Sequence, residues 1–295
     1  MLNALTVDVE DYFQVSAFDN QLSRADWDSM PSRVVESTNR LLRLFDDRGA
    51  RGTFFVLGWV AERYPHLVRA IQAAGHEIAS HGYEHRLVYE NGPAALREDL
   101  RRSRGVLESI TGLKVRGYRA PSYSVTRQSL WALDILIEEG YEYDSSIYPI
   151  RHDRYGIPDW PRQIHEVRRP GGSIWELPGS TVQVLGTNLP IGGGGYFRLL
   201  PYMWTALGIA RLNRKEGRPA IFYIHPWEVD PGQPRLPGSM LSRFRHYRNL
   251  DRTEGRLQTL LTDFEFGTVA EVLDTVRVKE PAQAASAAAT VLWPA

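Results

Sequence analysis

The stretch that decides the fold is residues 52–85, GTFFVLGWVAERYPHLVRAIQAAGHEIASHGYEH. Its opening run, TFFVL, is short and apolar, as expected of a buried strand. Apolar residues then recur at helical spacing through PHLVRAIQAA, and Gly75 stands where a helix would end. A second apolar run, HEIAS, follows this glycine and leads directly into His81 and His85. The stretch therefore predicts a strand, a helix and a second strand whose end carries two histidines.

The same order of helix, glycine and short strand recurs along residues 33–146. A helical pattern over 201–216 and an apolar strand over 220–224 continue it later in the chain. Alternating helices and short buried strands are typical of a parallel sheet that is covered by helices. The sequence therefore predicts the α/β class.

The segment 148–200 interrupts this pattern and predicts an insertion of loops and antiparallel strands rather than a second domain. We expect one domain over residues 1–279, followed by a flexible Ala-rich tail at 280–295. The chain of 295 residues is 43% hydrophobic, so it contains enough apolar surface for a sizeable core.

Composition excludes several classes of function. The chain has no cysteine, which rules out disulfides, thiolate metal sites and cysteine nucleophiles. Its 35 basic and 35 acidic residues balance, so no nucleic-acid partner is expected. The opening MLNALTVDVED does not resemble a secretory signal, and no apolar run is long enough to form a membrane span. We therefore expect a soluble, cytoplasmic protein.

Polar residues gather where the predicted strands end. In parallel α/β folds the carboxyl ends of the strands meet at one edge or mouth, where function is concentrated. We therefore expect five clusters to converge on one site: Asp8 to Asp11, His81 to His85, Arg119 to Tyr123, Asp144 to Ser146, and His225.

The first two clusters predict a divalent-metal site. On a strand, Asp8 and Glu10 project to the same face, and a cation would relieve the repulsion between their carboxylates. Two histidines four residues apart can reach one ion, and imidazole with carboxylate suits zinc. We expect Glu10, His81 and His85 to bind the metal and Asp8 to act as general base. Asp11 stays open as an alternative ligand or as a helix or turn cap.

Arg119 precedes Ala120 and Pro121, and the proline makes this turn rigid. From such a base the guanidinium could pair with Asp8 and orient it, or form an ordinary structural salt bridge. Backbone N–H groups around Tyr123 are candidates to bind an oxyanion.

His225 ends the strand over 220–224, opposite the predicted base. This position suits a general acid that protonates a leaving group. Asp144 is the candidate residue that orients it, although the Asp-Ser-Ser run at 144–146 is equally consistent with a plain turn. The alternative for His225 is a packing histidine stacked beside Trp227. Aromatic residues, Trp227 among them, could present a face to a sugar ring, and Pro121 with Trp227 completes the predicted substrate contacts.

Together these motifs resemble the polysaccharide deacetylase family, the NodB-homology or carbohydrate esterase family 4 enzymes, over roughly residues 4–275. The resemblance rests on TVDVED, GTFFVLG, GHEIASHGYEH, GYRAPSY and YIHPWE, which occur in the family's order. It implies a distorted (β/α)7 barrel with the insertion around 148–200. It also implies five roles: Asp8 as base, Glu10 as metal ligand with the two histidines, Arg119 steering the base, Tyr123 serving the oxyanion, and His225 as acid.

Three features distinguish this chain within the resemblance. DVEDYFQV and HPWE are most similar to the branch associated with exopolysaccharide export and exosortase systems. The acidic pair of the first motif is spread as D-V-E-D, so Glu10 and Asp11 both remain open as ligands. Gly82 replaces the Ser or Thr that commonly follows the first histidine of the family.

The resemblance implies a zinc-dependent hydrolase that removes N-acetyl groups from N-acetylhexosamine units of a polysaccharide or oligosaccharide and releases acetate. Two alternatives remain: a metal-independent, allantoinase-like amide hydrolase, and a non-catalytic glycan-binding module. The sequence leaves the oligomeric state open.

Overall fold

A computed structural model of the chain describes residues 1–19 and 21–283. Within these residues, one nine-stranded sheet has the order β10-β1-β2-β3-β4-β5-β7-β6, and β11 also pairs with β1. Seven of its strands, from β10 to β7, run parallel, as the predicted seven-stranded architecture requires. The strands are β1 (Asn3–Val9), β2 (Thr53–Val56), β3 (Glu77–Ser80), β4 (Gly117–Tyr118), β5 (Tyr143–Asp144), β6 (His165–Arg169), β7 (Gly172–Glu176), β10 (Ile221–Ile224) and β11 (Phe266–Gly267).

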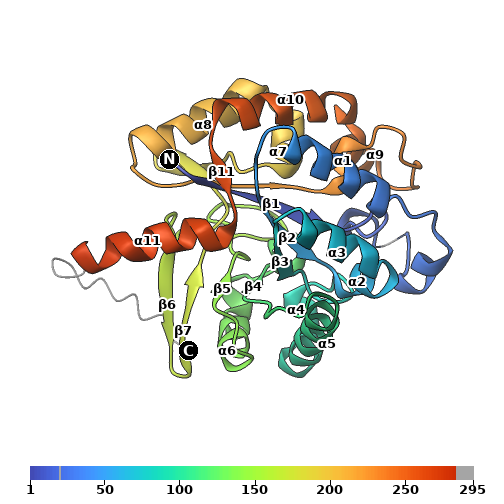
Figure 1. Cartoon of the computed structure of the whole chain (residues 1–295), viewed down its shortest axis with the longest axis horizontal. Helices are drawn as coiled ribbons and strands as arrows, with labels where there is room; N and C mark the ends of the chain where they lie inside the picture. The colour runs from blue at the N-terminus through green and yellow to red at the C-terminus, as the bar shows by residue number, and fades with distance from the viewer. Residues whose placement is uncertain (20, 284–295) are drawn as a thin grey trace.

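Helices surround the curved sheet, with α8 and α10 side by side at one end and α5 and α6 at the other (Figure 1). The α-helices are α1 (Val34–Asp46), α2 (Gly58–Arg63), α3 (Pro65–Ala73), α4 (Val88–Asn91), α5 (Pro93–Thr111), α6 (Trp131–Glu138), α7 (Gly194–Leu199), α8 (Tyr202–Arg214), α9 (Met240–Tyr247), α10 (Leu250–Asp263) and α11 (Val269–Gln283). Short 3₁₀ turns are η1 (Ser16–Phe18), η2 (Arg24–Ser29), η3 (Pro121–Tyr123), η4 (Arg127–Ser129) and η5 (Pro226–Val229). No helix in the described part of the chain is both long and apolar enough to cross a membrane.

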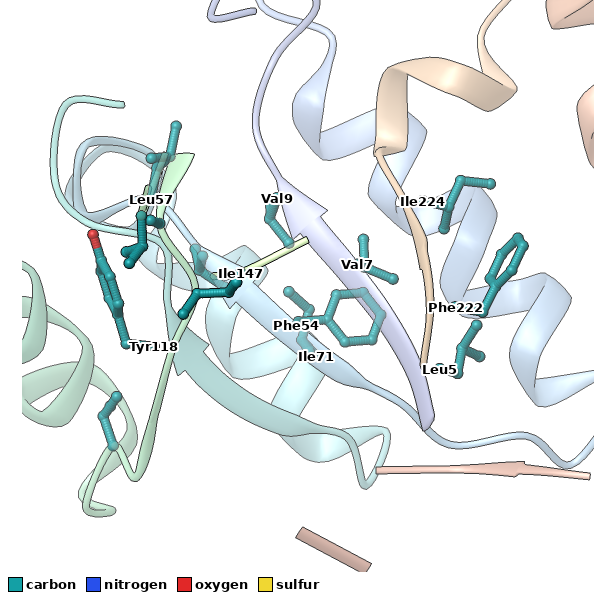
Figure 2. Close-up of a cluster of buried hydrophobic side chains, with 14 of the residues drawn as sticks. Leu5, Val7, Val9, Phe54, Leu57, Ile71, Tyr118, Ile147, Phe222 and Ile224 are labelled. Atoms are coloured by element: carbon teal, nitrogen blue, oxygen red, sulfur yellow. The ribbon is translucent and has the colours of Figure 1, made fainter. Parts of the chain in front are cut away.

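The core has two layers because alternate residues of each strand point to opposite faces of the sheet. The outer layer lies between the sheet and the helices. Figure 2 shows its side chains on three neighbouring strands: Leu5, Val7, Val9, Phe54, Phe222 and Ile224. The inner layer contains Ala4, Phe55 and Ala79, and α11 packs against it through Val272 and Leu273. The polar residues of the inner face therefore lie toward the other end of the strands.

The segment 148–200 contains the predicted antiparallel strands, but it also supplies part of the main sheet. β6 and β7 form a hairpin, and β7 then pairs in parallel with β5. β8 (Thr181–Val184) and β9 (Thr187–Pro190) form a separate two-stranded sheet. The sequence pattern missed the seventh parallel strand because an antiparallel strand, instead of a helix, precedes it.

Within the described residues, no strand pairing joins β7 to β10. The glycine run after β9 lies along β10 instead: Tyr223 N–H donates to the carbonyl of Gly192 at 2.7 Å. Gly193 has a φ of +123°, and a Cβ there would lie 1.9 Å from the carbonyl oxygen of Tyr223. Only glycine allows this close approach of the two backbones. The predicted tail, 280–295, begins as the last turn of α11, and its remainder, 284–295, lies outside the described residues.

His76 precedes β3 and is buried, with 8% of its surface exposed. Its Nδ1 accepts a hydrogen bond from the Gly52 N–H at 3.2 Å, and its ring centre lies 4.8 Å from that of Phe54. Burial is the main cause that lowers the pKa of His76 to about 4. The folded protein therefore keeps this imidazole neutral at pH 7.

We expect the free energy of unfolding to decrease as the pH falls from about 6.5 to 4. Over this range the unfolded chain protonates His76, whereas the folded protein binds that proton only near pH 4. The contribution is on the order of 3 kcal/mol. His76→Asn keeps a hydrogen-bond acceptor toward Gly52 and should make the pH dependence of urea unfolding shallower. An unchanged pH dependence in this variant would contradict the prediction.

Candidate functional site

The polar side chains converge at the carboxyl ends of the parallel strands, as predicted. Asp8 lies near the end of β1, and Glu10 directly follows this strand. His81 follows β3, Arg119 follows β4, and His225 follows β10. Since β10, β1, β2, β3 and β4 are consecutive neighbours in the sheet, these ends lie along one mouth.

Glu10, His81 and His85 form a compact group that suits a metal ion. One ligand atom from each residue lies within 4.8 Å of the others, and all three side chains are buried. His85 Nε2 lies 2.7 Å from Glu10 Oε2, and His81 Nε2 lies 4.0 Å from the same oxygen. Burial lowers the pKa of His81 to about 4, so its imidazole is in the neutral form that metals require.

Hydrogen bonds fix the orientation of this group. His81 Nδ1 lies 2.8 Å from the carbonyl oxygen of Arg119, which places the N–H on Nδ1 and leaves Nε2 free as a ligand. The indole N–H of Trp227 donates to Glu10 Oε1 at 3.1 Å. The carboxylate and one imidazole are thus each positioned by a residue from a different strand end.

Trp227 was predicted to present a face to a sugar ring, but in the structure it packs against other residues of the site. Its ring stacks against His225 at 5.0 Å and against His246 at 4.2 Å, and the side chain is buried. The indole N–H instead holds Glu10. The packing alternative for His225 is correct in that it stacks on Trp227, but its ring nitrogens also face carboxylates.

Asp8 and Arg119 form a buried ion pair, with 2.7 Å between Arg119 Nη1 and Asp8 Oδ1. Nη1 also donates to the hydroxyl of Thr6 at 2.8 Å, and Nε and Nη2 donate to the carbonyl and hydroxyl of Ser145. The guanidinium lies 4.2 Å from the ring centre of Phe55. The predicted pairing of Arg119 with Asp8 is therefore present, and the second oxygen of Asp8 stays free to face the site.

His225 lies against both acids of the first strand. Its Nε2 is 3.9 Å from Asp8 Oδ2 and 3.7 Å from Glu10 Oε1. Its Nδ1 is 2.6 Å from Glu228 Oε1. Burial opposes protonation, but Glu10, Glu228 and Asp8 outweigh it and raise the pKa of His225 to about 9.

Glu228 and Arg198 are the site residues that sequence reasoning missed. Glu228 Oε2 accepts from Arg198 Nε at 2.5 Å, and Arg198 also donates to the carbonyl of His246 at 2.9 Å. Burial opposes ionisation of Glu228, but Arg198 and His225 lower its pKa to about 2. The spacing of Glu228 three residues after His225 is a local signal that could have identified it. Arg198 has no such signal, because it comes from α7.

The prediction that Asp144 orients His225 is wrong. Asp144 pairs in register with Glu176 across β5 and β7, and its carboxylate accepts a hydrogen bond from the Ser146 hydroxyl. Burial raises the pKa of Asp144 to about 6 and that of Glu176 well above its usual value. Asp144 therefore belongs to a buried carboxyl pair beneath the mouth, because its strand ends on the inner face beside β7.

Asp11 is a helix cap rather than a ligand. Its Oδ2 accepts hydrogen bonds from the Ser32 hydroxyl at 2.6 Å and from the backbone N–H groups of Arg33 and Val34 at 2.8 and 3.1 Å. Its Oδ1 accepts from the Tyr12 N–H at 2.9 Å. Both oxygens are thus engaged, and Oδ2 lies at the N-terminus of α1, where the helix dipole favours a negative charge.

The turn Pro121–Tyr123 is tight, with φ values of +53° at both Ser122 and Tyr123. The Tyr123 N–H donates to the carbonyl of Ala120 at 3.1 Å, so this amide is already bonded. The Tyr123 ring centre lies 5.4 Å from the guanidinium carbon of Arg119, and Pro121 is buried. The turn therefore supports Arg119, and the predicted oxyanion role of Tyr123 lacks a free amide on that residue.

The backbone conformation and the close approach of Asp99 explain why residue 82 is a glycine. Its φ is +75°, and a Cβ would lie 2.7 Å from Asp99 Oδ2. Asp99 instead accepts a hydrogen bond from the Tyr83 N–H at 2.9 Å, while the Gly82 N–H donates to the Ser80 hydroxyl at 3.2 Å. The loop between the two histidines is therefore braced by Asp99 and Ser80.

Two family models match consecutive parts of the chain. Residues 24–142 match the family described as polysaccharide deacetylase, and residues 145–274 match a domain of unknown function, DUF3473. Residues 24–142 are therefore similar to the polysaccharide deacetylase family.

Among individual relatives, a peptidoglycan deacetylase-like protein of Gibberella zeae is 33% identical over 37% of this chain and 32% of its own length. The chain thus spans about a third of the length of the first curated relatives that it matches. The crystal structure of a Mycobacterium smegmatis protein assigned to the polysaccharide deacetylases has a TM-score of 0.63 at 22% identity, covering 94% of this chain and 90% of that one. Puue allantoinase has a TM-score of 0.62 at 16% identity, with the same coverage of both chains. Both structures share the fold.

The matched substitutions Glu10→Gln and Asp11→Asn separate the ligand from the cap. We expect Glu10→Gln to lose divalent-metal binding, because Glu10 shares a pocket with His81 and His85. Asp11→Asn should bind metal normally but unfold more easily by about 1–2 kcal/mol, since it loses acceptors at the start of α1. Zinc titration by calorimetry and thermal unfolding measure the two effects. The reverse pattern would make Asp11 the ligand.

Proposed function

We propose that this protein is a divalent-metal-dependent hydrolase that removes N-acetyl groups from N-acetylhexosamine units of a polysaccharide or oligosaccharide and releases acetate. The observation that carries the proposal is the placement of Glu10, His81 and His85 directly beside the Asp8–Arg119 pair and His225. A binding module would not need an acid, a base and a group of metal ligands buried at one mouth.

The residues present fit a divalent cation. The group offers one carboxylate and two imidazoles within ligand distance of one another, and a fixed N–H on His81 directs its other nitrogen toward Glu10. Zinc is the proposed ion, because it prefers these ligand types. When bound, it would act as a Lewis acid toward the acetamide carbonyl and make a water molecule acidic enough to attack at neutral pH.

The chain's own residues then divide the proton transfers. Asp8 Oδ2, which does not contact Arg119, accepts the proton of the attacking water, while Arg119 holds the other oxygen at 2.7 Å. His225 enters in the protonated form, which its neighbouring carboxylates favour, and gives its Nε2 proton to the departing sugar amine. Glu228 keeps the imidazole in position through Nδ1. Acid and base therefore lie at the same mouth, with 3.9 Å between His225 Nε2 and Asp8 Oδ2.

The proposed substrate follows from the family and the surroundings of the site. The relatives are named as deacetylases of peptidoglycan, and the family as one of polysaccharide deacetylases. Tyrosines crowd the neighbouring wall, where Tyr123, Tyr148 and Tyr223 form one cluster with Tyr155 and Tyr196 packed against it. Such rings suit sugar faces. An exopolysaccharide remains the proposed glycan, on the resemblance of the DVEDYFQV and HPWE motifs.

Chelation and a single substitution test the proposal. We expect the protein to release acetate from N-acetylglucosamine oligomers, to lose this activity after exhaustive chelation, and to regain it with Zn²⁺. Asp8→Asn should lower kcat by a factor of about 10²–10⁴ while metal binding persists, because it removes the base but none of the ligands. Acetate assays and zinc titration measure both. Full activity after chelation would instead support a metal-independent amide hydrolase.

Glu228→Gln tests whether the missed residue positions the acid. We expect kcat to fall at least tenfold with little change in KM, since Glu228 contacts His225 but lies behind it as seen from the site. Zinc affinity should be unchanged, and Glu228→Asp should restore part of kcat. An equal loss in kcat and zinc affinity would indicate that the variant has merely disturbed the fold.

A further inference from the structure

A pocket beside the candidate site has no part in the proposed proton transfers. It has a volume of about 210 Å³ and lies between the loop around Ser16, the turn at Ser122, the segment 152–155, α7 and α9. Trp227, which holds Glu10, also lines it, so the pocket adjoins the metal ligands. Its size suits one sugar unit next to the unit that carries the acetamide.

One wall of the pocket is aromatic. The Tyr155 ring stacks on His152 with 3.9 Å between ring centres, and it lies parallel to Tyr148 at 6.1 Å. Burial is the main cause that lowers the pKa of His152, and the stacked His152 ring extends the aromatic surface. Rings of this kind contact the apolar faces of sugars.

Another part of the lining is cationic. Arg154 and Arg245 both line the pocket and are exposed, and neither has a carboxylate oxygen within ion-pair distance in the part of the chain that is described. No aspartate or glutamate is among the residues that line the pocket. Arg198 also lines it, but Glu228 neutralises that side chain.

Two acidic residues, Asp153 and Asp19, lie near the pocket, and neither forms an ion pair with Arg245 in the described part of the chain. Asp153 lies outside the lining, with its Oδ1 at 2.9 Å from His152 Nδ1. Asp19 is close enough to Arg154 for the two charges to interact. Arg245 lies on α9, and the segment 235–249 contains four arginines and no acidic residue. Because the whole chain has equal numbers of basic and acidic residues, this excess of positive charge is local.

We propose that the pocket is a subsite for an acidic sugar, with Arg245 as the main and Arg154 as the secondary partner of its carboxylate. A guanidinium binds a carboxylate through two parallel hydrogen bonds, which suits a hexuronate. The substrate class is then a glycan in which the N-acetylhexosamine to be deacetylated neighbours a hexuronate. This inference rests on the proposed function, because it assumes that the acetamide group of the substrate binds at the mouth beside Glu10, His81 and His85.

Three oligosaccharides of equal length test the subsite: an N-acetylglucosamine oligomer, an oligomer in which N-acetylglucosamine alternates with hexuronate, and the same alternating oligomer with its carboxylates reduced to alcohols. We expect kcat/KM for acetate release to be about tenfold higher for the acidic oligomer than for its reduced form, mainly through KM. Arg245→Gln should abolish most of this preference, and Arg154→Gln should reduce it.

Arg243→Gln is the matched control. Arg243 lies on the same helix and carries the same charge, but it does not line the pocket, so its substitution should leave the preference unchanged. Equal effects of Arg243→Gln and Arg245→Gln would show a diffuse attraction and overturn the subsite. Equal kcat/KM for the acidic and reduced oligomers would also overturn it.

A binding measurement separates this inference from the proposed function. Calorimetry on the Asp8→Asn variant should show tighter binding of the acidic oligomer than of the reduced one, and the added Arg245→Gln substitution should remove the difference. If no oligomer released acetate but this binding difference persisted, the proposed function would fail and the subsite would stand. Acetate release without any binding difference would reject the subsite alone.

Discussion

The buried guanidinium of Arg119 is the interaction on which the site depends. Its side chain joins Thr6 and Asp8 of β1 to Ser145 after β5, and its carbonyl oxygen holds His81 after β3. A buried arginine without these partners would be costly, since a charge in the interior must be paired and hydrogen-bonded. The same contacts that satisfy this charge therefore fix the candidate base, a candidate metal ligand and the spacing between strand ends. The Phe55 and Tyr123 rings cover it on the apolar side.

A second buried ion pair supports the opposite side of the mouth. Arg198 holds Glu228, Glu228 holds His225, and Trp227 from the same turn holds Glu10. The turn η5 thus controls both the candidate acid and one candidate ligand. Stability and function share these contacts, because Arg198 and His225 keep the buried Glu228 carboxylate charged while Glu228 positions the candidate acid. The cationic pocket adjoins this side of the mouth. Arg198 of α7 and His246 of α9 line the pocket and also contact Glu228 and Trp227 of η5.

Local pattern was enough to locate most of the site. Short apolar strands after glycine-terminated helices marked where the chain changes direction, and the polar residues next to them faced one mouth because parallel strands end at the same edge. Asp8, Glu10, His81, His85, Arg119 and His225 were therefore found together. Asp144 also follows the pattern of a polar residue at a strand end, but it pairs with Glu176 of β7. The sequence did not reveal this partner, because the pattern of the segment that contains β7 suggested an insertion. Asp11 was within one residue of a ligand, yet its carboxylate turned to the start of α1.

The sequence by itself determined the α/β class, most of the parallel strands and the residue types of the candidate metal site, because these follow from hydrophobic period, glycine positions and ligand chemistry. The tertiary structure alone decided which partner each polar side chain has. Arg198 reaches Glu228 from 30 residues away, and Trp227 reaches Glu10 from 217 residues away. Such contacts depend on where distant elements pack in space, and no local spacing in the chain encodes them.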